Sequence, residues 1–350
     1  MAHENYKPVL EITRGNIVES VHFGAIAVVD AAGTLVASWG DPATKTYLRS
    51  SAKPFQAMPL IELGGAETFG LTDREIAVTC ASHSGTDEHA GVIRSIQQKV
   101  GVREDNLQCG VHEPFHRPTA LAMLQRGEEP TSIRHNCSGK HTGMLAQATL
   151  RGLPIEDYLN PGHPVQQLDL QTFAEMCSVD INDIDLGIDG CSAPVWAIPL
   201  QNAALGYARL VNPAGLPPAR AAACRRIVRA MTSNPDMVAG PERFDTVLME
   251  CCSGKVVAKG GAEGYQGMGI LPDVLHPGHP GLGIALKISD GDAGGRAVSA
   301  VALEVLRQLG LLSAEQIAAL PKFGSKDVLN WRKLVAGEIR PVFELIKGGG

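Results

Sequence analysis

The two ends of this chain have the sequence pattern of β-strands, whereas the long segment between them has the pattern of helices. Near the N-terminus, VHFGAIAVVD and TLVASWGD flank the short turn AAG, which predicts a hairpin. Near the C-terminus, GKVVAKGG, EGYQGMGIL and GLGIALKISDG are three further β-rich runs separated by glycine-rich turns. Strands that stop for a helical region and then resume favour an α+β fold, with one antiparallel sheet assembled from both ends of the chain.

The middle of the chain places apolar residues at helical spacing. The helical runs are HAGVIRSIQQKVG, TALAMLQRG, VQQLDLQTFAEMC, VWAIPLQNAALGYARLV and PARAAACRRIVRAMTS, and GGRAVSAVALEVLRQLG follows the last strand. We therefore expect sheet-forming segments at 10–64 and 240–310, with a mostly helical region at 65–239 inserted between them. Because no internal repeat or low-complexity linker interrupts the sequence, residues 1–350 are predicted to form a single unit.

Charge and composition exclude several classes of partner. The 31 basic and 37 acidic residues are scattered, and the net charge of -6 leaves no basic stripe for a nucleic acid or an anionic membrane. The N-terminal MAHENYKPVLEITRG lacks the apolar core of a signal peptide, and no apolar run is long enough to span a bilayer. The eight cysteines are irregularly spaced, which favours reduced thiols and leaves a metal site open. These features predict a cytoplasmic protein and leave small neutral or zwitterionic partners open.

The segment RSSAKPF, residues 49–55, has two interpretations. In the first, Ser50 or Ser51 caps the following apolar helix and Pro54 occupies its first turn. In the second, Ser50 and Lys53 lie on one helix face and form the Ser-x-x-Lys arrangement of an activated serine nucleophile. A chain of this length contains about one such motif by chance, so the segment alone leaves both interpretations open.

Two later segments extend the nucleophile interpretation. Ser82 to Ser84 in CASHSGTDEHAG form either the cap of the next helix or a loop at a site. Lys259 in KVVAKGGAEG is either a solvated strand end or a site lysine, and the glycines after it would let a substrate lie close to the backbone at Gly260. An early Ser-x-x-Lys, a middle serine loop and a late Lys-Gly-Gly follow the order of the same elements in penicillin-recognising enzymes.

Two histidine-containing segments carry further reactive groups. HNCSGKH, residues 135–141, is the densest reactive cluster, and Cys191 in LGIDGCSAPVW offers a distant thiolate. A metal site and buried reduced thiols both remain possible there, since the spacing matches no standard zinc signature. HEPFH, residues 112–116, is a literal His-Glu-x-x-His, but Pro114 fits poorly in the helix that a zinc protease requires.

In combination, YLRSSAKPFQ, ASHSG, HNCSGKHTGML, DGCSAPVW and AKGGAEG resemble the L-asparaginase II family, the rhizobial-type or class 3 asparaginases. The resemblance runs from about Ile12 to the helix after Gly295. It implies a fold like that of serine β-lactamases, penicillin-binding proteins and serine-dependent glutaminases, and a homodimer that hydrolyses L-asparagine to L-aspartate and ammonia. Lys-Gly-Gly and Ser-His-Ser replace the usual elements of the wider superfamily, which argues against β-lactam recognition.

The resemblance also implies roles for individual residues. It pairs Ser50 with Lys53 and Ser82 with Lys259 as two catalytic Ser-Lys pairs. It assigns a zinc ion to three ligands, which are Cys137, Lys140 and Cys191. Whether that zinc is catalytic or structural, and whether Ser50 or Ser82 is acylated, are left open; the position of Ser50 at a helix start favours Ser50.

The neighbouring residues receive supporting roles. Arg49 is a candidate to bind the substrate α-carboxylate or to form a salt bridge, and Asp189 is expected to hold Lys140 in place. His83 and His141 either contact the substrate or pack in their loops. The alternatives are a glutaminase or penicillin-interactive serine hydrolase of the same fold, and a catalytically silent metal-binding protein.

Overall fold

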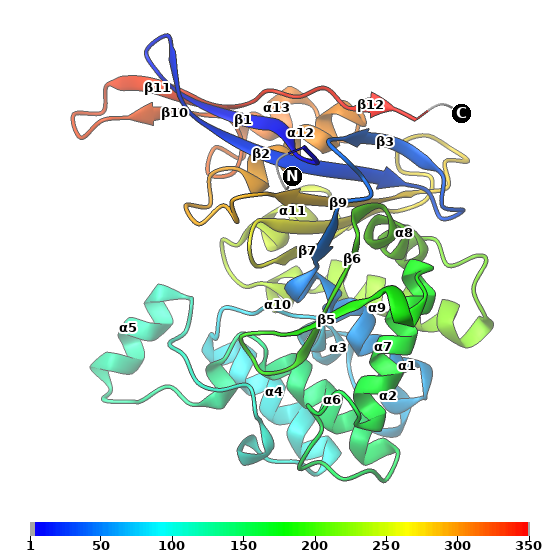
Figure 1. Cartoon of the computed structure of the whole chain (residues 1–350). Helices are drawn as coiled ribbons and strands as arrows, with labels where there is room; N and C mark the ends of the chain where they lie inside the picture. The colour runs from blue at the N-terminus through cyan, green and yellow to red at the C-terminus, as the bar shows by residue number, and fades with distance from the viewer. Residues whose placement is uncertain (1–3, 349–350) are drawn as a thin grey trace.

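The computed structural model describes residues 4–348 and consists of a large antiparallel sheet above a mostly helical region (Figure 1). The sheet follows the order β10-β11-β1-β2-β9-β8-β7, and β3 and β12 extend it from β2. Its strands are β1 (Lys7–Arg14), β2 (Ile17–Val29), β3 (Leu35–Trp39), β7 (Val256–Gly261), β8 (Tyr265–Ile270), β9 (Leu282–Ile288), β10 (Lys326–Leu329), β11 (Val335–Pro341) and β12 (Ile346–Lys347). The predicted α+β class, with one sheet assembled from both ends of the chain, is therefore confirmed.

The helices occupy most of the middle of the chain. They are α1 (Lys53–Glu62), α2 (Gly65–Thr68), α3 (Asp73–Thr79), α4 (Asp87–Val100), α5 (Arg117–Gln125), α6 (Ser138–Leu150), α7 (Pro164–Cys177), α8 (Leu200–Val211), α9 (Pro218–Ser233), α10 (Pro235–Val238), α11 (Phe244–Cys251), α12 (Val298–Gln308) and α13 (Ala314–Ala318). None of the helices in the described part of the chain is long and apolar enough to cross a membrane.

The join between the two ends of the chain lies at the centre of the sheet. β2 pairs with β9 in a register that sets Ile26 opposite Leu286 and Val28 opposite Ile284. All four side chains are fully buried. β-branched and leucine side chains fill such a pleated, two-sided core well, so this pairing joins the N-terminal hairpin to the C-terminal strands.

Two parts of the sequence prediction are corrected. VWAIPLQNAALGYARLV is not one helix, because Pro194–Pro199 forms β6 in a small sheet with β4 (Lys45–Tyr47) and β5 (Asp185–Ile188). Pro199 precedes the first residue of α8, and the β-branched and aromatic residues before it favour a strand. The main sheet also extends beyond the expected segments, since β1 begins at Lys7 and β10 to β12 lie after residue 310.

Helix α8 lies very close to the sheet because glycines face it. A Cβ atom on Gly283 of β9 would lie 1.8 Å from the carbonyl oxygen of Ala204 in α8, and one on Gly267 of β8 would lie 2.3 Å from the ring of Tyr207. Tyr207 in turn donates a hydrogen bond of 2.7 Å to the carbonyl oxygen of Ser51. The glycine surface of the sheet thus fixes the position of the segment that carries Ser50.

We expect Gly283→Ala to lower the free energy of unfolding by about 3 kcal/mol or more, because the added methyl group collides with helix backbone that has no room to retreat. Chemical denaturation of the purified protein measures this loss. Gly91→Ala is the matched control, since a Cβ there meets no atom within 4 Å and the position is exposed in α4. The control should be neutral or slightly stabilising.

Candidate active site

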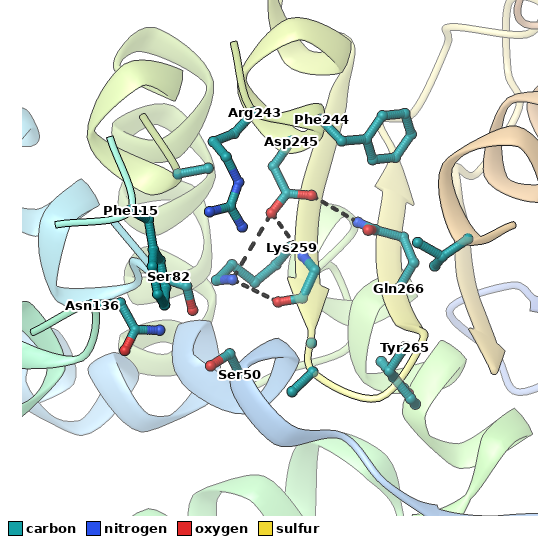
Figure 2. Close-up of a pocket in the computed structure, with 15 residues that line it drawn as sticks. Ser50, Ser82, Phe115, Asn136, Arg243, Phe244, Asp245, Lys259, Tyr265 and Gln266 are labelled. Atoms are coloured by element: carbon teal, nitrogen blue, oxygen red, sulfur yellow. Dashed lines mark hydrogen bonds and ion pairs between the residues drawn. The ribbon is translucent and has the colours of Figure 1, made fainter. Parts of the chain in front are cut away.

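A cavity of about 310 Å³ opens between the start of α1, the loop after α3, the end of β7 and the start of α11. Its lining residues are Ser50, Ser82, Phe115, Asn136, Ala239, Arg243, Phe244, Asp245, Lys259, Gly260, Gly261, Ala262, Tyr265, Gln266 and Val298. Figure 2 shows the hydroxyl groups of Ser50 and Ser82 and the amine of Lys259 pointing into this common space. The structure therefore brings together three of the four predicted catalytic side chains.

Ser50 lies on a single 3-10 turn, Arg49–Ala52, directly before α1. Neither this turn nor α1 has a side-chain cap, so the interpretation of Ser50 or Ser51 as a helix cap is wrong. Pro54 does occupy the first turn of α1, as predicted. The Ser51 hydroxyl instead donates to the carbonyl oxygen of Lys259, which ties this turn to β7.

Lys53 is directed toward Ser82 rather than toward Ser50. Its amine is buried and donates to the carbonyl oxygen of Ala81 at 2.7 Å, to Ser82 Oγ at 2.9 Å and to Cys137 Sγ at 3.1 Å. A buried amine needs such partners because it has lost its contacts with water. All three acceptors lie on the Ser82 side, which explains why the expected Ser50–Lys53 pair is replaced by a Ser82–Lys53 pair.

The serine loop after α3 is held by backbone contacts. Ser82 N–H donates to the carbonyl oxygen of Val238 at 2.9 Å, and Ser84 Oγ donates to that of Ala239 at 2.7 Å. The cap of α4 is Thr86, so the capping interpretation of Ser82 to Ser84 is wrong. The loop therefore presents Ser82 to the cavity while its ends stay fixed.

Lys259 is a buried lysine at the cavity wall, with a side-chain exposure of only 1%. Its amine donates to the carbonyl oxygen of Gly260 at 2.7 Å and lies 3.9 Å from Asp245 Oδ2 (Figure 2). Burial lowers the pKa of Lys259 to about 7, and Lys53 and Arg243 act in the same direction while Asp245 opposes them. The solvated-strand interpretation is wrong, and a large fraction of this amine is neutral near pH 7.

The two glycines after Lys259 allow β7 to approach the Ser50 turn. A Cβ on Gly261 would lie 2.4 Å from the carbonyl oxygen of Leu48, so a larger residue would push the two segments apart. Gly260 lines the cavity, but its N–H group donates to Asp245 Oδ2 at 2.7 Å. Gln266 Nε2 donates to the other oxygen of Asp245 at 3.0 Å, which completes a rigid wall.

Three of the predicted substrate contacts lie outside the cavity lining. Arg49 binds Asp189 through Nη2 and Nε at 2.7 and 2.9 Å, which is the salt bridge that the sequence left open. Burial opposes the charge on Asp189, but Arg49 and Lys140 outweigh it and lower the pKa of this carboxyl group. His83 is buried against Ser138 Oγ at 2.9 Å, and His141 is buried against the Tyr158 hydroxyl at 2.7 Å. These positions match the alternative in which both histidines pack in their segments.

The three predicted zinc ligands converge behind Lys53. Lys140 Nζ lies 3.0 Å from Cys191 Sγ, and the thiols of Cys191 and Cys137 are in hydrogen-bond contact. All three side chains are buried. The Cys191 contact, aided by Lys53 and Lys140 and opposed by burial, lowers the pKa of the Cys137 thiol well below its usual range. Since zinc binds thiolates, this donor set fits the ion.

The zinc donor set depends on the lysine. Within residues 4–348, no group of three or more His, Cys, Asp or Glu side chains is arranged to hold a metal. Lys140 would therefore supply the third donor atom. Burial opposes the charge on its amine, but Cys191, Cys137 and Asp189 outweigh burial and raise the pKa of Lys140, so zinc would have to displace a proton from it. The cluster lies outside the cavity lining. It is connected to the lining in two ways: Lys53 contacts both Cys137 and the lining residue Ser82, and Asn136, the residue before Cys137, is itself a lining residue.

Several lining residues were missed by the sequence interpretation. Asn136 lies within HNCSGKH and Phe115 within HEPFH, beside the cysteine, lysine and histidines that are the reactive groups of these segments. HEPFH forms no helix, and His112 Nε2 accepts a hydrogen bond of 2.9 Å from Asn136 N–H. Arg243 and Asp245 come from the start of α11, in a stretch without a recognisable motif.

Comparison with known proteins gives one family and several distant structures. A Bacillus glutaminase aligns over 82% of this chain and 91% of its own, with 13% identity and a TM-score of 0.40. A probable glutaminase from Bacillus subtilis, in complex with 6-diazo-5-oxo-L-norleucine, aligns over 82% and 84%, with 13% identity and a TM-score of 0.39. No curated protein matches the sequence. The family model for L-asparaginase II matches residues 10–341, and the chain therefore belongs to the L-asparaginase II family of hydrolytic amidases.

Proposed function

We propose that this protein is an L-asparaginase that hydrolyses the side-chain amide of L-asparagine, with Ser50 as nucleophile and Lys259 as general base. The observation that carries the proposal is the buried Lys259 amine, whose pKa lies near 7, in one cavity with two serine hydroxyl groups. A base with a pKa near the working pH is the most effective proton acceptor. The membership of an amidase family supplies the class of bond that this pair would attack.

The choice between the two serines rests on their hydrogen bonds. Ser82 Oγ accepts a hydrogen bond from the Lys53 amine, which engages an oxygen lone pair and fixes the side chain. Ser50 is half-buried on its turn, and its hydroxyl points into the cavity (Figure 2). Ser50 is therefore proposed as the nucleophile, and Ser82, held by Lys53, would relay a proton to the leaving ammonia.

The proposed reaction has two halves. Ser50 Oγ attacks the side-chain amide carbon while its proton passes to neutral Lys259, and the carbonyl π electrons move to oxygen. When the tetrahedral species collapses, the C–N bond breaks and the Lys259 proton leaves with ammonia through Ser82. A water molecule then attacks the aspartyl ester and gives its proton to Lys259. The ester C–O bond breaks, Ser50 regains a proton, and L-aspartate is released.

Zinc is proposed as a bound ion outside the substrate cavity. Cys137, Lys140 and Cys191 would hold it, and Lys140 would have to be neutral to donate its lone pair. When bound, zinc would add positive charge behind Lys53 and hold the HNCSGKH segment together. This segment carries Asn136, so the same contacts would keep one wall of the cavity in place.

We expect the purified protein to contain about one zinc ion per chain and Cys191→Ala to contain none. Because zinc would bind only the folded state, its removal should lower the melting temperature by several degrees. Metal analysis by mass spectrometry and thermal denaturation measure both effects. Cys251→Ala, at a half-buried thiol outside the cluster, is the matched control. Full zinc occupancy in Cys191→Ala would reject this ligand set.

The substrate is tested by ammonia release from L-asparagine and L-glutamine, beside a chromogenic β-lactam. Turnover of asparagine with little action on the other two supports the proposal. Preferred turnover of glutamine would make the chain a glutaminase with the same chemistry. The homodimer implied by the family resemblance is checked in the same preparation by light scattering.

A further inference from the structure

Arg243 is a cation at the cavity that the proposed reaction does not use. It lies directly before α11, is exposed, and lines the same space as Ser50 and Lys259 (Figure 2). Within residues 4–348, no carboxylate forms an ion pair with it, whereas Arg49 is bound by Asp189. The cavity thus has one unpaired guanidinium near its hydroxyl groups.

The guanidinium of Arg243 has a defined position. Its carbon Cζ lies 5.9 Å from the ring centre of Phe115, which reaches the cavity from the segment before α5. A cation over an aromatic ring is attracted to its face, and the planar guanidinium keeps its N–H groups free at the edge. Phe115 is 55% exposed, so its ring lies open at the cavity beside the guanidinium.

The substrate class requires such a cation. An α-amino acid amide carries a carboxylate at the end opposite the scissile amide, and a guanidinium binds a carboxylate through two parallel hydrogen bonds. We infer that Arg243 binds the α-carboxylate of the substrate and that Phe115 positions the guanidinium for this contact. This inference rests on the proposed amidase function.

The inference gives Arg243 a role in selectivity. One end of the substrate is fixed at Arg243 and the other reacts at Ser50, so the distance between these two groups selects the length of the side chain. Asparagine and glutamine differ by one methylene group, a difference that a fitted site discriminates by about 10-fold to 200-fold. Arg49, which the sequence suggested for the carboxylate, is already engaged by Asp189.

The test compares Arg243→Gln with wild type on L-asparagine and on L-asparaginamide, in which a neutral amide replaces the α-carboxylate. We expect Arg243→Gln to lower kcat/KM for L-asparagine about 100-fold, mainly through KM, since it removes a hydrogen-bonded charge. Hydrolysis of the side-chain amide of L-asparaginamide, followed by chromatography, should fall far less, because only the effect of Arg243 on the pKa of Lys259 is lost for that substrate. Arg243→Lys should restore only part of the loss, because lysine lacks the planar fork.

Two further variants complete the design. Phe115→Ala should raise KM for L-asparagine about 3-fold to 5-fold with little change in kcat, and Phe115→Tyr should behave like wild type. Arg225→Gln is the matched control, at an exposed arginine of α9 away from the cavity. An unchanged KM in Arg243→Gln, or an equal loss on both amides, would overturn the inference.

The failure of this inference and that of the proposed function are distinguishable by direct binding. Calorimetry with the product L-aspartate measures recognition of the carboxylate without any turnover. If wild type binds L-aspartate and Arg243→Gln does not, while neither hydrolyses an amide, the inference stands and the asparaginase proposal falls. If wild type and Arg243→Gln hydrolyse L-asparagine equally well, the asparaginase proposal stands and the role of Arg243 is rejected.

Discussion

Ser50→Ala is expected to lower kcat for L-asparagine by at least a thousandfold while the protein remains folded. The variant removes the only atom that forms the ester bond in the proposed reaction, and loss of a nucleophile of this kind costs a factor of about 10³ to 10⁶. Its hydroxyl caps no helix, so the alanine should have little effect on stability. Ammonia release and thermal denaturation, measured on the same preparation, separate the two effects.

Ser82→Ala tests which of the two serines is the nucleophile. The Ser82 hydroxyl would relay a proton and forms no bond to the substrate, so its loss should cost about 10-fold to 1000-fold, less than the loss of Ser50. The reverse order, with Ser50→Ala active and Ser82→Ala inactive, would make Ser82 the nucleophile. The Ser82–Lys53 hydrogen bond would then be the activating contact.

The second large effect concerns Lys259 and pH. Below about pH 7 the Lys259 amine becomes protonated and can no longer accept the Ser50 proton, so kcat should fall about tenfold per pH unit on the acid side. Lys259→Met should lose at least a thousandfold at pH 8. Lys259→Arg should be equally inactive, because arginine stays charged. A wild-type kcat that stays constant from about pH 5 to about pH 8 would exclude Lys259 as the base.

The same amine also affects stability, with a definite sign. In the unfolded chain the pKa of Lys259 returns to its ordinary value of 10.5, so between about pH 7 and that value the unfolded state binds more protons. This group therefore makes the free energy of unfolding rise with pH across that window. Below about pH 7, where the amine is protonated in both states, Lys259 destabilises the folded protein to its full extent. Lys259→Met should weaken the rise, which denaturation at several pH values measures. The inactive variant should thus be at least as stable as wild type at pH 7.

Local sequence patterns predicted those strands of the sheet whose apolar runs are buried in the folded protein. The runs that became β2, β7, β8 and β9 are apolar and β-rich, and their pairing required only that the chain ends meet. The strands after residue 310 could not be predicted in this way, since no residue of β10 is buried and only Gly337 and Ile339 of β11 are. For VWAIP, the apolar spacing suited both a helix and a strand, and its pairing with β4 and β5 decided the outcome.

The residue types at the site were visible in the sequence, but their partners were not. Ser-x-x-Lys spacing suggested contact between Ser50 and Lys53, yet the lysine amine reaches acceptors that come from a different loop and from Cys137. Arg243 and Phe115 are separated by more than a hundred residues and belong to no shared motif, so only the fold brings them together. The lowered pKa of Lys259 likewise depends on burial, which follows from tertiary packing.

The most direct test of the account is to identify the residue that becomes covalently modified by a substrate analogue. A diazoketone analogue of L-asparagine reacts with an activated nucleophile at the position of the side-chain amide, and peptide mass spectrometry locates the adduct. We expect one adduct, on the peptide that contains Ser50, and no adduct when L-aspartate is present in excess. An adduct on Ser82, or no modification of a folded protein that hydrolyses L-asparagine, would contradict it.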